Sequence, residues 1–429
     1  MADDLSFELP ELAAELMAAR TVEALEAALG KVAGLTPRIR EPQNFGHRLF
    51  TRGLDAGLER VARALQLAAV PPPKSNAKVA IVASQFYATG GHTRVARDVA
   101  DALGPDNRPL VILTNMGDGS VRYQGLLNSG LKTPFDEAAL LVAQARTLVD
   151  RTIELFMMLK ATGVSRIVLM CHPFDVVAIT ACWPFREIVD FLHHADHVPA
   201  LGAAMAWSTH ADLTYACHKT CRAAGLEPIY AGMTSTVTEA PAHARAPGRL
   251  RLATCGDQRK YVGEGRFRWA DWAVAALSLP GAEMRHIGVM SDDLQQEVHK
   301  ALADAGVDPA RYVFAGMAPS LPAALIEHGT DIYVGSYPFG GGKANLEAML
   351  MGLPMIAPAD ADLANLLRFS LPLPGWVDVA EPKDFARAVE EALALEPTLA
   401  SAEHARLRAR EVERFGRWVA GERPESPEA

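Results

Sequence analysis

Hydrophobic positions along the chain follow two different patterns. Up to about residue 70, apolar side chains recur at helical spacing, as in Leu12, Leu16, Ala19, Val22, Leu25 and Leu29. From Lys78 onward, short Val- and Ile-rich runs alternate with segments of helical composition, and three prolines, Pro71–Pro73, separate the two regions. Continuous apolar runs spaced by helices are typical of a parallel sheet covered on both faces. The pattern therefore predicts a helical extension, 1–70, followed by α/β structure.

The apolar runs form two sets of similar size. The first set predicts a helix at 93–103 and strands at 78–84, 109–114, 166–171, 188–193, 213–217 and 228–232. The second set predicts strands at 250–255, 283–289, 312–316, 331–335, 354–357 and 376–379, with helices at 269–278, 292–305, 320–328, 344–351, 360–369 and 383–395.

The segment between the two sets, 233–248, lacks periodicity and contains two prolines, so it is interpreted as a linker. We therefore expect an α/β protein with two Rossmann-like, doubly wound domains, 74–235 and 246–400. A closing helix, 401–420, and a disordered tail, 421–429, are predicted to follow.

Composition narrows the functional classes. The 429 residues carry a formal net charge of −9, which disfavours sequence-independent nucleic-acid binding. No apolar run approaches the length of a membrane span, and the acidic start does not resemble a signal peptide, so a cytoplasmic protein is expected. The five cysteines are interpreted as reduced thiols. Cys217 and Cys221 could form half of a zinc site, but no second pair follows at finger spacing, and no metal site is predicted.

The stretch 331–358, DIYVGSYPFGGGKANLEAMLMGLPMIAP, reads as strand, glycine loop, helix and strand. Gly340, Gly341 and Gly342 allow close approach of the backbone to a ligand, and the helix predicted to open near residue 344 directs unpaired N–H groups into the loop. Such a loop suits a phosphate or diphosphate, with Lys343 adding a positive charge and Glu347 placed to accept hydrogen bonds from a ribose. The alternative is a structural glycine turn beside a solvated glutamate.

This stretch resembles glycosyltransferases of the GT-B architecture through Pro338-Phe339-Gly340-Gly341 and the following Glu347-Ala348-Met349-Leu350-Met351-Gly352-Leu353-Pro354. Its loop is most similar to the branch containing O-GlcNAc transferase and related bacterial protein glycosyltransferases. The resemblance implies that the loop binds the diphosphate of a nucleotide sugar and that Glu347 binds the ribose. It also implies a cation after the first strand of the second domain, where Lys260 matches best and Gln258 or Arg259 second.

One departure from a related pattern bears on mechanism. A neighbouring, retaining branch carries a second glutamate where this chain has Phe339, so inversion is the better expectation. No metal or other cofactor is expected to be required, because Lys260, Lys343 and the N-terminus of the helix after the glycine loop are expected to stabilise the leaving diphosphate.

Polar residues after strands of the first domain are candidates for the acceptor side. Gly90, Gly91 and His92 follow the first strand and resemble a turn that faces the interdomain cleft in GT-B enzymes. His92 is a candidate general base, because a helix N-terminus lowers a histidine pKa and keeps the ring neutral. Alternatively, the glycines only reverse the chain and His92 only packs.

A second polar cluster, 193–197 (HHADH), ends another predicted strand, where doubly wound sheets bind ligands. Asp196 and His197 are candidate catalytic groups, and His194 and His172 candidates for the sugar or acceptor pocket. A metal reading is disfavoured because a strand and turn would not place His193 and His197 on one face. The remaining alternative is a structural polar turn.

Together these features predict a glycosyltransferase that moves a sugar from a nucleotide diphosphate donor, expected to be a UDP-hexose or UDP-N-acetylhexosamine, to an acceptor. Two alternatives stay open: a nucleotide-sugar epimerase of the same fold and a non-catalytic scaffold. The helical extension could grip a protein acceptor or simply pack on the first domain.

Overall fold

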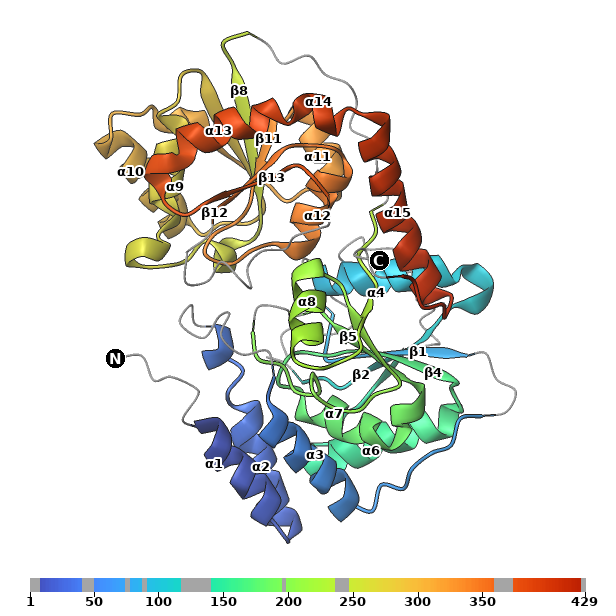
Figure 1. The fold of residues 1–429 in the computed structure, drawn as a ribbon. Helices are drawn as coiled ribbons and strands as arrows, with labels where there is room; N and C mark the ends of the chain where they lie inside the picture. Colours follow the sequence, from blue (N-terminus) through green and yellow to red (C-terminus); the bar gives the residue numbers. More distant parts are fainter. Residues whose placement is uncertain are drawn as a thin grey trace. The chain divides into compact units, whose positions relative to one another are not determined.

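The computed structural model describes residues 8–40, 50–73, 78–86, 91–116, 140–194, 198–235, 247–358 and 373–425. The chain divides into two compact units (Figure 1). Unit 1 comprises 1–213, 217–231 and 416–429, and unit 2 comprises 214–216 and 232–415. The N-terminal helices therefore belong to the same unit as the first sheet.

Unit 1 is built on a seven-stranded sheet in the order β3-β2-β1-β4-β5-β6-β7. All neighbouring strands are parallel. The strands are β1 (Val79–Ala83), β2 (Leu110–Leu113), β3 (Leu140–Val142), β4 (Arg166–Met170), β5 (Val189–His193), β6 (Thr209–Asp212) and β7 (Ile229–Tyr230). Strand β1 is buried at every position, which explains its continuous apolar sequence.

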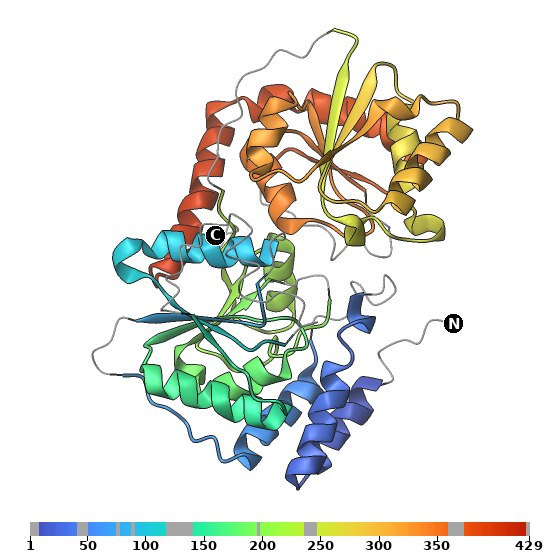
Figure 2. The same cartoon turned by 180° about the vertical axis from the view of Figure 1, so that it is seen from behind.

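Helices cover both faces of this sheet (Figures 1 and 2). They are α1 (Glu8–Ala18), α2 (Val22–Ala33), α3 (Arg52–Ala64), α4 (Gly91–Leu103), α6 (Leu148–Thr162), α7 (Val176–Cys182), α8 (Tyr215–Ala223) and the C-terminal end of α15 (Ala402–Val419). Short 3-10 turns occupy Arg38–Arg40, Pro105–Asn107 and Trp183–Ile188.

The N-terminal helices pack on the helices of this unit, with α2 against α6 and α3 against α7. Glu26 of α2 accepts hydrogen bonds at 2.8 Å from the backbone N–H groups of Leu148 and Val149, which caps α6. Asp55 of α3, 3% exposed, accepts hydrogen bonds from Gly202 N at 2.7 Å and Ala204 N at 3.0 Å. The helical extension therefore packs on the first domain, which is one of the two roles expected for it.

Unit 2 contains a six-stranded sheet in the order β10-β9-β8-β11-β12-β13, and its paired strands are parallel. Its strands are β8 (Leu250–Cys255), β9 (Ala282–Ile287), β10 (Tyr312–Gly316), β11 (Ile332–Val334), β12 (Met355–Pro358) and β13 (Trp376–Val379). Its helices are α9 (Trp269–Leu277), α10 (Asp292–Asp304), α11 (Leu321–Glu327), α12 (Gly342–Leu350), α13 (Phe385–Ala394), α14 (Glu396–Leu399) and the start of α15. Further 3-10 turns lie at Gln258–Lys260, Gly265–Phe267, Pro309–Arg311 and Pro382–Asp384.

One core fills the space between the unit 2 sheet and helices α9, α10 and α13. Trp269, Trp272, Tyr261, Tyr312 and Phe385 are each 1% exposed and belong to it. On the other side, α11 packs on α12. The core thus fixes β8 and β11, whose carboxyl ends carry the loops discussed below.

Most predicted elements lie within two residues of the observed ones, but one predicted strand is wrong and one observed strand was missed. The strand predicted at 213–217 is wrong: β6 ends at Asp212, and residues 215–223 form α8. The short strand β3 was not predicted. Helix α12 begins at Gly342 rather than near residue 344. The helix predicted at 360–369 lies outside the described residues.

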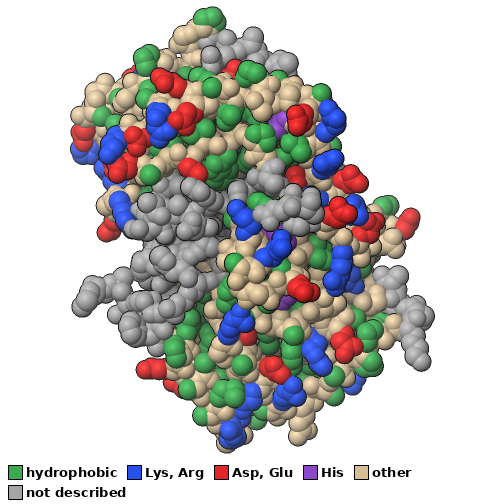
Figure 3. All heavy atoms as spheres, viewed as in Figure 1, with side chains coloured by type: hydrophobic (Ala, Val, Ile, Leu, Met, Phe, Trp, Pro, Cys, Tyr) green, Lys and Arg blue, Asp and Glu red, His purple; other side chains and the backbone are tan. Residues whose placement is uncertain are grey.

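Positive and negative side chains are interspersed over the described part of the face drawn in Figure 3. Among the described helices, none combines the length and the apolar character that crossing a bilayer would need. All five cysteines are free thiols, four of them buried and Cys255 half-buried.

Candidate active site

The glycine loop of unit 2 lies where the strand order of the sheet reverses. The chain runs outward from β8 to β9 and β10, then returns to the other side of β8 with β11. Loops after β8 and β11 therefore diverge from the carboxyl ends of two neighbouring strands. In open α/β sheets this switch point is where ligands bind. Its two loops here are 256–261 and 335–341.

Lys260 and the glycine loop lie against each other. In the sequence, only the resemblance to GT-B glycosyltransferases connected them. A methyl group built on Gly341 would lie 2.8 Å from Lys260 Nζ. The backbone N–H of Phe339 donates to the carbonyl of Lys260 at 3.3 Å, and the hydroxyl of Ser336 donates to the carbonyl of Phe339 at 2.7 Å. Burial lowers the pKa of Lys260. An anion in the loop would restore the preference of this amine for its charged form.

The second-choice residues of the same segment, Arg259 and Gln258, have other partners. Arg259 forms an ion pair with Asp257 at 2.5 Å and is largely exposed. The side chain of Gln258 accepts a hydrogen bond from the backbone N–H of Ser291 at 3.0 Å. Of the three candidates, Lys260 is the one whose side-chain nitrogen lies at the glycine loop.

Helix α12 follows the loop directly. Gly341 is its N-cap residue and Gly342 its first residue, so the free N–H groups of the first turn lie at the loop. Gly340 lies in the loop itself, and Gly341 has an ordinary negative φ of −107°. Gly341 is therefore needed for space at this point, not for a left-handed backbone.

Lys343 does not occupy the place expected for it. Its side chain is buried, and its ammonium group donates a hydrogen bond to the carbonyl of Thr234, in the same unit. The early start of α12 makes Lys343 its second residue, which accounts for the different direction. Glu347, one turn further, is 7% exposed, so most of its surface is already covered by protein.

Three predicted residues of unit 1 converge at the carboxyl ends of its strands. His92 stands at the start of α4 after β1, His172 follows β4, and His194 follows β5. The ring of His92 lies 4.7 Å from that of His194 and 6.0 Å from that of His172, centroid to centroid. Strands β1 and β4 flank the switch point of this sheet, so this histidine cluster occupies the position in unit 1 that the glycine loop occupies in unit 2.

Burial lowers the pKa of both His92 and His194, and the nearby His92 and His172 rings lower the pKa of His194 further. The rings are therefore neutral near pH 7, as a general base requires. Desolvation lowers the pKa of His92. The sequence predicted a lowered pKa from the helix N-terminus instead. The Nε2–H of neutral His92 donates to the carbonyl of Met170 at 2.6 Å, which leaves Nδ1 as the basic atom.

The remaining candidates are less defined. Gly91 is the exposed first residue of α4. Gly90, Asp196 and His197 lie outside the described residues.

Sequence reasoning missed a buried network below the histidine cluster. Asp175, 1% exposed, accepts hydrogen bonds at 2.5 Å from the hydroxyls of Ser84 and Thr114, and at 2.8 Å from the N–H of Ala178, which it caps. The hydroxyl of Ser84 also accepts a hydrogen bond from the backbone N–H of His172 at 2.7 Å. The network ties the ends of β1, β2 and β4 together and holds His172. Its only sequence signal was Asp175 at the N-cap position, directly before the apolar helix α7.

No family model matches the sequence, and no curated protein matches it. Solved structures do match the fold. The apo form of the lipopolysaccharide outer core galactosyltransferase WaaB has a TM-score of 0.53 at 15% identity, covering 79% of this chain and 95% of that one. Anabaena Alr3699/HepE in complex with UDP gives 0.55 at 15% identity, covering 80% and 97%. A glycosyltransferase from Rickettsia africae gives 0.55 at 10% identity, covering 80% and 96%. These similarities and the two parallel sheets show that the chain has the two-domain α/β fold of GT-B glycosyltransferases.

Proposed function

We propose that the protein is a glycosyltransferase that takes its sugar from a nucleotide diphosphate sugar, with UDP as the nucleotide. The observation that carries the proposal is the contact between Lys260 and the glycine loop at the switch point of unit 2. A cation, a loop open to close backbone approach and the first turn of a helix together provide charge and hydrogen-bond donors for a diphosphate. UDP is favoured because HepE, which shares the fold, is described in complex with UDP.

In this proposal the same groups stabilise the leaving diphosphate as the sugar is transferred. The acceptor is assigned to unit 1, where the histidine cluster supplies neutral imidazole rings, one of which is proposed to take the proton of an acceptor hydroxyl. Inversion is supported by Phe339 in place of a second glutamate. Independence from a catalytic metal is supported by the positive charge that Lys260 places at the glycine loop. The loop motif supports the branch of O-GlcNAc transferase, and with it a protein acceptor and an N-acetylhexosamine.

The experiment is a thermal-shift screen of the purified chain against UDP, GDP, TDP, CMP and ADP, followed by calorimetric titration with the best ligand. At 100 times its dissociation constant, a ligand of the folded state adds about 2.7 kcal/mol to the unfolding free energy. We expect UDP to raise the melting temperature of the native protein. The rise should disappear in Lys260→Met and remain in Arg259→Ala, a matched control that removes the neighbouring, exposed cation. Equal shifts in the two variants, or no shift by any nucleotide at millimolar concentration, contradict the proposal.

An epimerase of the same fold would also bind UDP, so binding alone does not separate the two activities. Incubation with UDP-N-acetylglucosamine separates them. An epimerase converts the sugar without an acceptor, whereas a transferase needs an acceptor and releases UDP as it transfers the sugar. A scaffold protein would do neither.

A further inference from the structure

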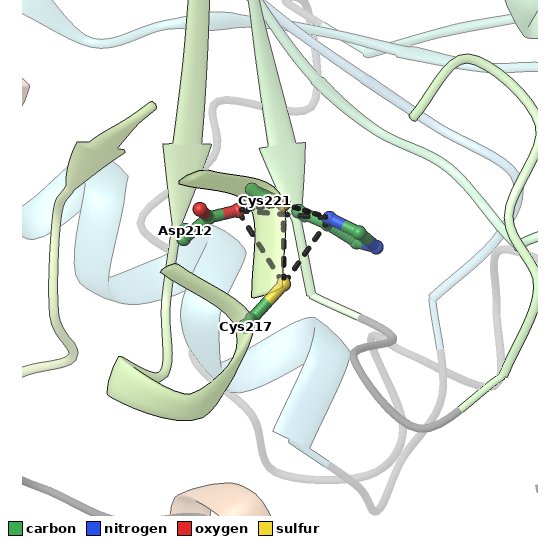
Figure 4. A group of neighbouring side chains, drawn as sticks. Asp212, Cys217 and Cys221 are labelled. Atoms are coloured by element: carbon green, nitrogen blue, oxygen red, sulfur yellow. Dashed lines mark hydrogen bonds and ion pairs between the residues drawn. The ribbon is translucent and has the colours of Figure 1, made fainter. Parts of the chain in front are cut away.

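Four buried side chains of unit 1 bring their donor atoms together beside the sheet. They come from His193, Asp212, Cys217 and Cys221, which are at most 1% exposed. Their ligand atoms all lie within 4.8 Å of one another. Figure 4 shows the two sulfur atoms and the carboxylate of Asp212 directed at a common point. None of these residues belongs to the histidine cluster or to the glycine loop.

Local structure explains how this cluster forms. His193 and Asp212 are the last residues of β5 and β6, and they are register partners in the parallel pair. Helix α8 begins three residues after Asp212, and Cys217 and Cys221 are four residues apart on it. Residues four apart share one helix face. Two strand ends and one helix face therefore supply the four groups.

The distances between the ligand atoms resemble the edges of a tetrahedron. Cys217 Sγ lies 3.2 Å from His193 Nδ1, 3.4 Å from Asp212 Oδ1 and 3.9 Å from Cys221 Sγ. Cys221 Sγ lies 3.6 Å from both His193 Nδ1 and Asp212 Oδ1, and these last two atoms are 3.6 Å apart. With zinc bonds of about 2.3 Å to sulfur and about 2.0–2.1 Å to nitrogen or oxygen, a tetrahedral site has edges of about 3.3–3.8 Å.

The chemistry of the donors also selects the ion. Two thiolates, one imidazole and one carboxylate suit Zn²⁺, and they do not suit the oxygen-preferring Mg²⁺ or Ca²⁺. Four protein ligands and near-complete burial are typical of a structural site, because a catalytic zinc keeps an open position.

Without an ion, the same groups would form a hydrogen-bonded cluster. Burial lowers the pKa of His193, but the hydrogen bonds and charges of Asp212 and Cys221 outweigh it and raise that pKa to about 10. The imidazolium would then supply the positive charge. That alternative explains the pairing of His193 with Asp212, but it gives no reason for two cysteine sulfurs at tetrahedral distances from both.

We propose that His193, Asp212, Cys217 and Cys221 form a structural Zn²⁺ site that fastens α8 to the carboxyl ends of β5 and β6. Since His194 follows His193 directly, the site also anchors the strand end that presents His194 to the histidine cluster. This proposal is independent of the proposed transferase activity.

The test begins with the full chain, purified without a histidine tag and dialysed against metal-free buffer. Elemental analysis should find about one zinc per chain, released on titration of the thiols with a mercurial reagent. Protein produced with Co²⁺ in place of zinc should show the intense visible bands of tetrahedral cobalt and thiolate-to-cobalt charge transfer in the near ultraviolet. Less than about one tenth of an equivalent of zinc, together with no such spectrum after Co²⁺ addition, overturns the proposal.

Variants assign the ligands. Cys217→Ser, Cys221→Ser and Asp212→Asn should lose the bound zinc or weaken it by at least about 10-fold. Cys182→Ala, which removes a buried thiol elsewhere in unit 1, should retain it. Full zinc content in folded Cys217→Ser and Cys221→Ser would contradict the assignment. If the cysteine variants do not fold, the cobalt spectrum of the native chain still decides, because it reports thiolate ligation directly.

Discussion

The ammonium group of Lys260 lies against the backbone of Gly341, so close that a methyl group on that glycine would stand 2.8 Å from the nitrogen. The two residues lie in loops that follow different strands, β8 and β11, which are neighbours in the sheet of unit 2. The glycine therefore keeps open the space that this cation uses. This relationship makes the loop testable by a very small change.

Gly341→Ala should weaken UDP binding about 10-fold or more while changing stability by no more than about 1 kcal/mol. The added methyl group meets the flexible end of a lysine, which can move away, but it then leaves the loop. Gly30→Ala is the control, because nothing lies within 4 Å of its added carbon and its place inside α2 favours alanine. Calorimetric titration with UDP measures both. A Gly341→Ala protein that binds UDP normally would refute this use of the loop.

Glu347 is expected to bind the ribose of the donor. Hydrogen bonds to a charged group contribute about 1.5–3 kcal/mol, so Glu347→Gln should weaken UDP binding about 10- to 100-fold. The same substitution should lower the affinity for 2′-deoxy-UDP much less than the affinity for UDP, because that nucleotide already lacks one of the two ribose hydroxyls. Titration of the native and variant chains with both ligands completes the cycle. Equal losses for the two nucleotides would mean that Glu347 supports α12 and does not bind the 2′-hydroxyl.

Asp55 connects α3 to the 202–204 turn. Asp55→Ala leaves the buried N–H groups of Gly202 and Ala204 without their carboxylate, so the free energy of unfolding should fall by about 2–4 kcal/mol at pH 7.5. Asp55→Asn, which keeps one acceptor oxygen, should lose less. Urea unfolding followed by circular dichroism measures the change, with the exposed Asp106→Ala as control. A loss no larger than that of the control would show that the helical extension is only loosely attached.

His286 makes unit 2 sensitive to acid. It is fully buried; Trp269 donates to the hydroxyl of Tyr312 at 2.9 Å, and that hydroxyl lies 2.8 Å from His286 Nδ1. Burial lowers the pKa of His286 to about 4. The unfolded chain, with a pKa of about 6.5, therefore binds the proton first, and stability is lost as the pH falls from about 6.5 to about 4.

The expected loss from this group is about 2–3 kcal/mol between pH 7 and pH 4.5. His286→Gln cannot titrate, so its unfolding free energy should decline less over the same interval. Urea unfolding of both proteins at several pH values gives the comparison. Parallel pH profiles would rule out His286 as the responsible group.

Much of the fold could be predicted because burial leaves a simple trace in the sequence. Strands such as β1 and β8 are apolar throughout or nearly so, and their ends were located within a residue or two. The failure at 213–217 is equally physical. The true strand, β6, has the polar sequence THAD, and its burial depends on neighbours β5 and β7, which a local pattern does not contain. The apolar residues after it belong to α8.

The proposed zinc cluster was not predicted either. Cys217 and Cys221 had no second pair at finger spacing, and His193 and Asp212 were not connected to them. The topology that joins the four groups is non-local and could not be read from spacing. For Lys260 the resemblance to a family supplied the missing partner, whereas the direction of Lys343 depended on where α12 begins.

The composition of unit 1 has a consequence for the order in which the protein is made. Arg166 pairs with Asp190 at 2.5 Å and donates to the carbonyl of Trp418 at 3.0 Å, more than 200 positions later. All residues of unit 2 precede Gly416. On the ribosome, unit 2 can therefore complete its fold while unit 1, begun first, still waits for its last helix to emerge. During that interval the Trp418 carbonyl that receives Arg166 does not yet exist, so the amino end of β4 stays incompletely covered until the last residues of unit 1 have been made, and incompletely covered chains are prone to aggregate.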